Sequence, residues 1–193
     1  MNLYFDMEFT GLKKDTTIIS LGIVDQNGRS IYLEYTDYNK SDVDEWIKEN
    51  VIKNTIFLKD DLKEIEPHVT ENGTDAVVVG NTEYNRQVLK YWLSLYDNKD
   101  IQFVSDVCHY DMVLLIDALY GHGLNILSNV SIDCHNINQD IAAYKKISIK
   151  EAADVVRESL VAKEIEGMKV QKHNALFDAL VIRLIYNKIN KLV

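Results

Sequence analysis

The chain has 193 residues, of which 47% are hydrophobic, and a formal net charge of −9. This length supports one buried core but is short for two independent domains, so we expect a single domain over residues 1–193. The negative charge argues against a passive nucleic-acid binder, because Lys and Arg supply most of the affinity of such proteins for phosphate. It does not exclude a metalloenzyme, because bound divalent cations reverse the local field that a phosphate meets.

Cysteine usage and hydropathy set the expected compartment. The two cysteines, Cys108 and Cys134, are too few for a disulfide framework and lack the spacing of a zinc site. No segment reaches the roughly 20 apolar residues of a membrane span, and the first residues do not form a charged leader followed by an apolar run. We therefore expect a soluble, unprocessed protein in a reducing cytoplasm.

The first 35 residues predict an antiparallel meander. Residues 2–9 alternate as a strand, with Leu3, Phe5, Met7 and Phe9 on one face and Tyr4, Asp6 and Glu8 on the other. A second strand over 17–24 leads to Asn27-Gly28, a strong hairpin signal, and residues 30–35 return as a third strand.

Helical and strand patterns alternate through the rest of the chain. Ser41 is a plausible N-cap for a helix that runs through Val51. The further predicted segments are helical patterns at 57–67, 83–95, 110–119, 139–144, 148–160 and 174–189, strands at 76–79, 101–104 and 130–133, and a turn at Asn72-Gly73. Together they predict an α/β fold with a mixed central sheet, whose first three strands are antiparallel, flanked by helices.

Two carboxylates stand out in the first strand. Asp6 and Glu8 are two residues apart, so their side chains leave the same face of the strand. Other spaced acid pairs in the chain are typical of solvated surfaces, whereas this pair lies in a very apolar strand. Unpaired carboxylates there would cost several kcal/mol, which favours a metal ion or strong donors as the compensating partner.

A second informative segment precedes the last predicted helix. His173 comes just before that helix and Asp178 lies one turn inside it, which places an imidazole near a carboxylate. The alternative interpretation is structural: Asn174 caps the helix, Asp178 complements the helix dipole, and His173 is a loop residue.

Taken together, the two segments resemble a known family. Residues 6–12, Asp-Met-Glu-Phe-Thr-Gly-Leu, resemble the first motif of the DEDDh 3′-to-5′ exonucleases, and residues 173–179, His-Asn-Ala-Leu-Phe-Asp-Ala, resemble their third motif. The order of the motifs and their placement at opposite ends of the chain also fit. The resemblance implies an RNase H-like fold and two divalent metal ions, Mg²⁺ or Mn²⁺.

The middle acid of this family has two candidate segments here. Residues 80–85 are similar to the second motif, but Asn85 stands in the place of the acid. Residues 105–111 end a predicted strand and begin a helix, and their Tyr110-Asp111 pair matches the aromatic-Asp pattern. We choose Asp111 and keep Asp106 as the alternative. The arrangement is similar to a compact prokaryotic and phage subgroup, many of whose members are exoribonucleases.

The resemblance also implies a role for each matched residue. Asp6 would bridge both ions, Glu8 and Asp178 would hold the ion that carries the nucleophile, Asp111 would support the leaving-group ion, and His173 would act as the base. Phe9, Thr10, Gly11 and Leu12 would line the terminal nucleotide.

We therefore expect release of nucleoside 5′-monophosphates from the 3′ end of a single strand. RNA is favoured over DNA only because of the resemblance to this subgroup. The alternative is an inactive RNase H-like module that binds nucleic acid or protein. A homodimer is expected as the commonest assembly. A cytoplasmic location would mean a bacterial cell, or the host cell if a phage encodes the protein.

Overall fold

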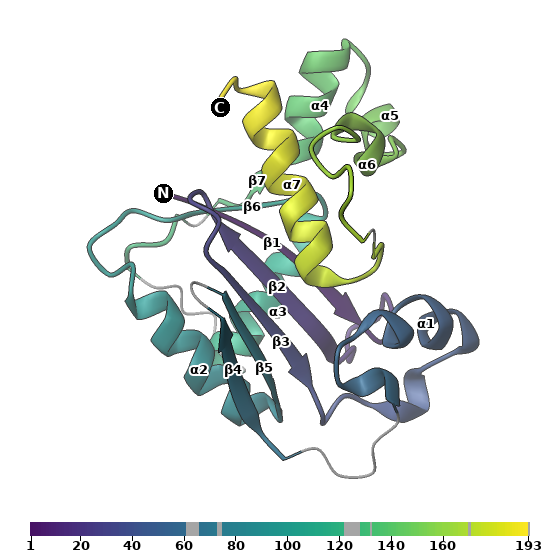
Figure 1. Ribbon diagram of the computed structural model, residues 1–193, viewed down its shortest axis with the longest axis vertical. Helices are drawn as coiled ribbons and strands as arrows, with labels where there is room; N and C mark the ends of the chain where they lie inside the picture. Colours follow the sequence, from purple (N-terminus) through teal and green to yellow (C-terminus); the bar gives the residue numbers. More distant parts are fainter. Residues whose placement is uncertain (61–65, 73–74, 122–127, 132, 170, 193) are drawn as a thin grey trace.

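A mixed β-sheet forms the centre of the computed structural model, which describes residues 1–60, 66–72, 75–121, 128–131, 133–169 and 171–192 (Figure 1). In these residues the sheet has seven strands in the order β4-β5-β3-β2-β1-β6-β7. The strands are β1 (Asn2–Phe9), β2 (Ile18–Asp25), β3 (Ser30–Tyr35), β4 (His68–Asn72), β5 (Asp75–Gly80), β6 (Gln102–Ser105) and β7 (His135–Asn136). Strands β1, β2 and β3 are antiparallel, and β6 pairs parallel with β1. The predicted α/β class and the antiparallel meander are confirmed.

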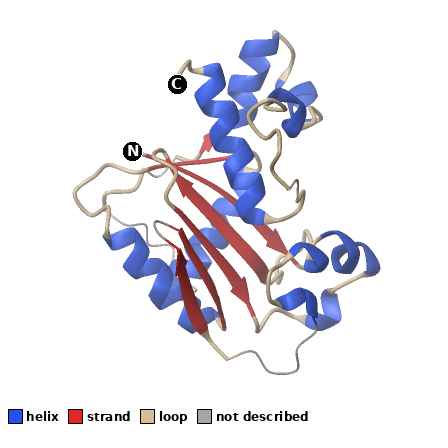
Figure 2. Ribbon diagram, viewed as in Figure 1, coloured by secondary structure: helices blue, strands red, loops and turns tan. Residues whose placement is uncertain are grey.

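Helices cover both faces of this sheet (Figure 2). The α-helices are α1 (Glu45–Asn50), α2 (Thr82–Ser94), α3 (Cys108–Tyr120), α4 (Ile137–Lys145), α5 (Ile149–Ala153), α6 (Arg157–Leu160) and α7 (Ala175–Ile189). Short 3₁₀ turns occupy Lys40–Asp42, Ile52–Asn54 and Leu58–Asp60. Among the described residues, no helix has the length and apolar character needed to cross a bilayer.

The alternation predicted for β1 divides the core into two layers. Leu3, Phe5 and Met7 pack in one cluster with Leu89 of α2 and Leu115 of α3. On the other face, Tyr4 packs in a second cluster with Ile141 of α4, Ile182 of α7 and other residues of those helices. In Figure 1, α7 crosses this second face with α4, α5 and α6 beside it, while α2 and α3 lie behind the sheet. Asp6 and Glu8 therefore emerge on the face that α7 covers.

The turn between β2 and β3 forms where Asn27-Gly28 predicts it. Asp25 accepts hydrogen bonds at Oδ1 from the backbone N–H groups of Asn27 (2.7 Å) and Arg29 (2.9 Å). Gly28 has φ +95°, a conformation that side chains with a Cβ disfavour. Local turn chemistry thus fixes the register of this hairpin.

One glycine lets α7 approach the sheet closely. Gly22 of β2 is the direct partner of Asp6 in the β1–β2 register. A Cβ on Gly22 would lie 2.4 Å from the backbone carbonyl carbon of Ala175 and from Cα of Leu176, both in the first turn of α7. Because the neighbouring atoms belong to the backbone, no side-chain rotation relieves that clash. The missing side chain brings the start of α7 onto the sheet beside Asp6.

One predicted segment in the first half of the chain is wrong. The described part of 57–67 does not form an α-helix: a 3₁₀ turn ends at Asp60, and β4 begins directly after Pro67, while residues 61–65 lie outside the described residues. Glu34 of β3 accepts the backbone N–H groups of Phe57 and Leu58, which holds this segment by a distant contact instead of a helical ladder. The turn predicted at Asn72-Gly73 falls partly outside the described residues.

The predicted cap of the first helix is also wrong. Asn39 caps the 3₁₀ turn and Asp44 caps α1, whereas Ser41 lies inside the 3₁₀ turn. Several residues whose side chains can cap a helix lie close together here, and only the folded backbone decides which of them becomes a cap.

Two further differences lie in the second half. Val130 makes an isolated bridge with Ile101, residue 132 lies outside the described residues, and the paired strand is β7, His135–Asn136. The helix predicted over 148–160 is two short helices, α5 and α6. Arg157 donates from Nη1 to the carbonyl oxygens of Ala153 (3.0 Å) and Val155 (2.6 Å), so a side chain binds carbonyls at the break between them.

Candidate active site

Strand β1 supplies the first two acids of the site. Asp6 and Glu8 leave the same face, as their spacing predicts, and both are partly buried. The register between β1 and β2 shifts between Glu8 and Phe9, which ends the regular pairing directly after the second acid. Both carboxylates thus lie in the second half of a strand that has a neighbour on each side in the sheet.

The third acid comes from the first turn of α3. Asp111 is only 2% exposed, and its Oδ2 accepts a hydrogen bond from the hydroxyl of Ser105, the last residue of β6. Because β6 runs parallel to β1, the end of β6 directs the start of α3 towards Asp6. The predicted choice of Asp111 therefore places a buried carboxylate beside β1.

The last two candidates flank the start of α7. Asn174 caps this helix by accepting the N–H of Phe177 at 3.1 Å, and the backbone N–H of His173 donates to Oδ2 of Asp178 at 2.9 Å. His173 has φ +61°, in the left-handed region that few residues other than glycine adopt. The structural interpretation of Asn174 is thus correct, and the same cap holds His173 beside Asp178.

An asparagine far away in the sequence fixes the segment that carries His173. Asn54 donates from Nδ2 to the carbonyl oxygen of Lys172 at 2.8 Å, and Asn174 donates to the carbonyl oxygen of Asn54 at 2.8 Å. These reciprocal bonds connect the segment after α1 to the start of α7. No sequence motif marks Asn54, because its role depends on a contact across more than 100 residues.

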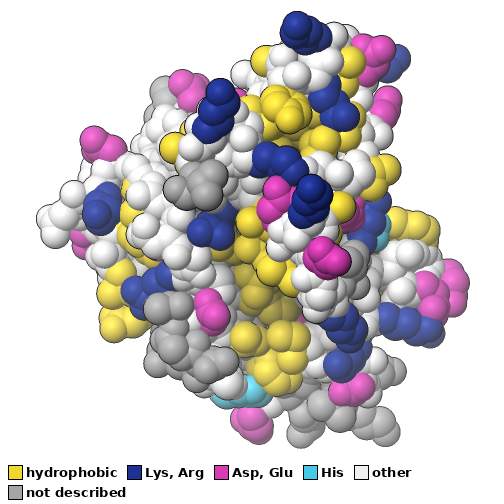
Figure 3. All heavy atoms as spheres, turned by 45° about the horizontal axis from the view of Figure 1, so that its top comes forward, with side chains coloured by type: hydrophobic (Ala, Val, Ile, Leu, Met, Phe, Trp, Pro, Cys, Tyr) yellow, Lys and Arg dark blue, Asp and Glu magenta, His cyan; other side chains and the backbone are white. Residues whose placement is uncertain are grey.

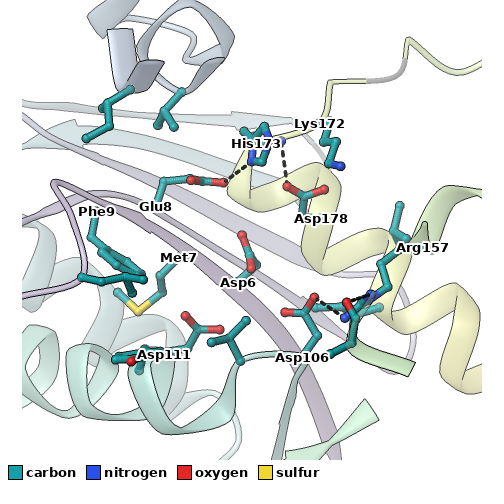
Figure 4. A pocket seen from close by; sticks show the side chains of 18 of the residues that line it. Asp6, Met7, Glu8, Phe9, Asp106, Asp111, Arg157, Lys172, His173 and Asp178 are labelled. Carbon is teal, nitrogen blue, oxygen red and sulfur yellow. Dashed lines mark hydrogen bonds and ion pairs between the residues drawn. The ribbon is translucent and has the colours of Figure 1, made fainter. Parts of the chain in front are cut away.

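The candidate side chains form two neighbouring groups (Figure 4). One comprises Glu8, His173 and Asp178, and the other comprises Asp6, Asp111 and Asp106; within each group the donor atoms lie within 4.8 Å of one another. In Figure 4, Asp6 lies between the first group and the other two acids of its own group. Both candidates for the middle acid thus reach the site, and the two assignments do not exclude each other.

Burial and mutual repulsion raise the pKa of each carboxylate that the family motifs match. The pKa of Glu8 rises to about 8, through burial and the charges of Asp178 and Asp111. Burial also raises the pKa of Asp111 to about 8 and that of Asp178 to about 7. The pKa of Asp6 rises well above its ordinary value, through burial and the surrounding acids. A cluster of this kind lacks positive charge, which a divalent cation would supply.

His173 has the opposite shift. Burial and the nearby Lys172 lower the pKa of its imidazole, so the ring is mainly neutral at pH 7. Its Nδ1 lies 3.9 Å from Oε1 of Glu8, and the ring of Trp46 meets it edge to face with centroids 5.1 Å apart. A neutral, oriented imidazole beside a carboxylate group is suited to accept a proton.

A pocket of about 760 Å³ contains both groups. Phe9, Gly11 and Leu12 line it, as predicted for the substrate segment, and Leu12 is 73% exposed. The side chain of Thr10 is instead 3% exposed and lies within hydrogen-bonding distance of the hydroxyl of Thr17. Trp46, which is 54% exposed, lines the same pocket from α1. Sequence analysis missed Trp46, because an aromatic residue in a short polar helix carries no recognisable motif.

The competing middle motif has a structural role. Asn85 is buried in α2, and its Nδ2 donates to the carbonyl oxygens of Glu34 (2.9 Å) and Gly80 (3.3 Å). The ring of His109 contacts that of Tyr110 at a tilt, with centroids 4.4 Å apart, and His109 does not line the pocket. Neither residue joins the two groups of candidate ligands.

Charged side chains are mixed on the face shown in Figure 3, where Lys and Arg are interspersed with Asp and Glu. No continuous basic stripe is visible on that face. Within the pocket, Lys172 and Arg157 stand among a larger number of acids. This distribution is consistent with the expectation that affinity for a phosphate depends on bound cations.

The fold of this chain is similar to that of known proteins. No protein-family model and no curated protein sequence matches the chain. Solved structures do match it. Pop2p of S. pombe, in a form with Mg²⁺ and Mn²⁺ bound, has a TM-score of 0.63 and 16% identity over 98% of this chain and 82% of that chain.

Two further structures agree. The RNase domain of yeast Pop2 has a TM-score of 0.64 and 15% identity over 99% of this chain and 77% of that chain. A 3′-exonuclease that recognises the 3′ end of the histone mRNA stem-loop has a TM-score of 0.59 and 13% identity over 98% of this chain and 81% of that chain.

These likenesses establish that the chain has the predicted RNase H-like fold. At such low identity the fold is the only property they establish. They give no support to the narrower prokaryotic and phage subgroup, which stays a prediction.

Proposed function

We propose that this protein is a metal-dependent 3′-to-5′ exonuclease that hydrolyses the terminal phosphodiester bond of a single-stranded nucleic acid and releases nucleoside 5′-monophosphates. The observation that carries the proposal is the convergence of Asp6, Glu8, Asp111, His173 and Asp178 in one pocket. These side chains come from both ends and the middle of the chain, and the sequence motifs named them independently of their positions in space.

The residues present fit two divalent cations. Mg²⁺ and Mn²⁺ prefer carboxylate oxygen donors, which each of the two groups offers within 4.8 Å. Burial, together with the charges of neighbouring acids, raises the pKa values of Glu8, Asp111 and Asp178, and a bound cation would offset both effects. We assign the ions to Asp6, Glu8, Asp111 and Asp178, and when bound they would supply the activated water and stabilise the attacking and leaving oxygens.

We assign to His173 the transfer of a proton from the attacking water. Its lowered pKa favours the neutral ring, and its Nδ1 lies 3.9 Å from Oε1 of Glu8. The backbone N–H of His173 bound to Asp178 fixes the imidazole relative to that acid. His173 would therefore accept the proton of the attacking water.

The substrate end would lie against the apolar part of the pocket. Gly11 has φ +138° and leaves open space where a Cβ would be, so a nucleotide can approach the backbone there. Leu12 and Trp46 expose apolar surface suited to contact an unpaired base. These features support a single strand, and the preference for RNA over DNA rests on the family resemblance.

A time course on 3′- and 5′-labelled RNA and DNA tests the proposal. We expect a 5′-labelled strand to shorten one nucleotide at a time and a 3′-labelled strand to release labelled mononucleotide, with Mg²⁺ or Mn²⁺ and not with chelator. Asp6→Ala should be inactive. Internal fragments would indicate an endonuclease, and binding without cleavage would favour the inactive module.

The assembly and location are separate proposals. A homodimer is tested by the mass in solution, and a cytoplasmic location by fractionation of the source cell. Neither is required for the chemistry described above.

A further inference from the structure

The two groups of candidate ligands contain one carboxylate that the proposed mechanism does not use. Asp106 follows the last residue of β6, and its side chain is 19% exposed. One of its oxygens lies within 4.8 Å of ligand atoms of both Asp6 and Asp111. An acid with this much access to solvent would ordinarily turn away from two other carboxylates, because like charges repel. Something must therefore hold Asp106 in place.

Two side chains from the helices beside α7 hold it. Arg157 of α6 places Nη2 3.3 Å from Oδ2 of Asp106, and Asn138 of α4 donates from Nδ2 to the main-chain oxygen of Asp106 at 2.7 Å. Figure 4 shows Asp106 directed towards Arg157, at the edge of the site opposite Glu8. Both the backbone and the carboxylate of Asp106 are thus fixed from the same layer.

Arg157 is itself rigid. Its Nη2 donates to Oδ1 of Asn138 at 2.8 Å, while Nη1 binds carbonyl oxygens at the end of α5. A guanidinium in proteins does not lose its charge, and its planar fork keeps a fixed geometry. These bonds hold both Nη atoms without Asp106, so the ion pair is not needed to position the guanidinium.

We propose that Asp106 is a fifth acidic ligand, acting on the ion held by Asp6 and Asp111, and that Arg157 is the positioning residue that keeps it there. The inference rests on the proposed function and deepens it by adding a residue outside the four matched acids. Arg157 binds one side of the Asp106 carboxylate and leaves the other for the shared ion. Outer contacts of this kind orient ligands in metal sites.

Calorimetric titration of the full chain with Mn²⁺, without nucleic acid, tests the role of Asp106. We expect two ions in the wild type. Asp106→Asn keeps the shape of the side chain. It should lower the affinity for one of the two Mn²⁺ ions by roughly tenfold or more and leave the affinity for the other unchanged. Asp140→Asn is the matched control, because Asp140 pairs with His135 outside the pocket. Wild-type affinity for both ions in Asp106→Asn would overturn the proposal.

The role of Arg157 is tested by coupling. Arg157→Gln should lower the affinity for the same Mn²⁺ ion as Asp106→Asn does. The double variant should bind that ion no more weakly than Asp106→Asn alone. Arg157→Lys keeps the charge and should recover part of the affinity. Arg183→Gln is the control, since Arg183 binds the carbonyl oxygen of Gln26 away from the pocket. A lower melting temperature in Arg157→Gln with unchanged affinity for Mn²⁺ would show a purely structural role and overturn the assignment.

The exonuclease activity and the role of Asp106 as a ligand are tested by different outcomes. If the wild type releases nucleotides and Asp106→Asn binds Mn²⁺ normally, the exonuclease stands and the fifth ligand falls. If the wild type is inert towards every strand while one Mn²⁺ ion still depends on Asp106, the exonuclease falls and the ligand assignment stands. A wild type that binds no Mn²⁺ overturns both.

Discussion

His173 combines an unusual backbone conformation with a lowered pKa. Its φ of +61° directs the imidazole towards Glu8 while its N–H binds Asp178. Strained conformations of this kind persist where surrounding contacts fix them, and here Asn54 and Asn174 supply those contacts. The residue that the sequence names as the base is thus held in a geometry that its own conformational preference does not favour.

Replacing His173 tests its role as the base. We expect His173→Ala to retain Mn²⁺ binding and to lose roughly two to four orders of magnitude in kcat. His173→Asn should behave in the same way with less loss of stability, because asparagine tolerates a positive φ. Single-turnover rates measure the loss, and His135→Ala is the control outside the pocket. Unchanged turnover in both His173 variants would remove this residue from the mechanism.

Because their pKa values are raised, the acids of the site should make the folded state less stable as pH rises, the reverse of the effect of acids whose pKa values are lowered by folding. Unfolded Asp and Glu have pKa values of about 4, whereas Glu8 and Asp111 titrate at about 8 in the folded chain without cations. Between these values the folded state holds protons that the unfolded state has lost, so the free energy of unfolding falls as pH rises. The slope is at most about 1.4 kcal/mol per pH unit for each such group.

Thermal melting in chelator between pH 5.5 and 8.5 measures this effect. We expect the melting temperature of the wild type to fall with pH, and Glu8→Gln to reduce the slope because one titrating group is removed. Glu45→Gln, at an exposed position in α1, should keep the wild-type slope. A melting temperature that rises over this range would contradict the raised pKa values.

At the scale of elements, the approach of α7 to β2 determines whether the site forms. Gly22 lies opposite Asp6 in the sheet and faces the backbone of Ala175 in α7. Asp178 lies one turn further along that helix. The distance between the first and third motifs therefore depends on a residue that belongs to neither.

Gly22→Ala tests this dependence. Since a Cβ would lie 2.4 Å from backbone atoms, α7 must move outwards, which we expect to cost about 1–3 kcal/mol and to lower kcat by displacing Asp178. Denaturant unfolding and initial rates measure the two effects. Ile23→Val, a buried change in the same strand, should cost about 0.5–1.5 kcal/mol and leave kcat unchanged. Full activity in Gly22→Ala would show that the close approach is dispensable.

At the scale of the whole molecule, the site joins both layers of helices to the sheet. Its side chains come from β1, α3 and α7, which lie on different faces of the sheet or within it. An ion that binds these side chains stabilises the folded state alone, because the unfolded chain does not bring them together.

Saturating Mn²⁺ should therefore raise the melting temperature. At one hundred times the dissociation constant a single ion adds about 2.7 kcal/mol, which corresponds to roughly 5–10 °C for a chain of this size. Asp6→Ala should abolish most of this shift. As a control, chelator should not change the melting temperature of either protein when no divalent cation is added. No shift with Mn²⁺ in the wild type would argue against a metal site at these residues.

The sequence by itself determined the strand alternation that puts Asp6 and Glu8 on one face, the Asn27-Gly28 hairpin, and the helix cap that places His173 before Asp178. Each depends on contacts within a few residues, so local periodicity and capping chemistry suffice to predict it. The two end motifs were recognisable because their residue types and order are specific.

Only the tertiary structure decided the remaining features. Strand β4 needs β5 as its partner, the break between α5 and α6 is bound by Arg157, and Asp106 reaches the site through contacts with Arg157 and Asn138. None of these pairings has a local signal in the sequence. In each case the partner is distant along the chain, or no recurring sequence motif marks the contact.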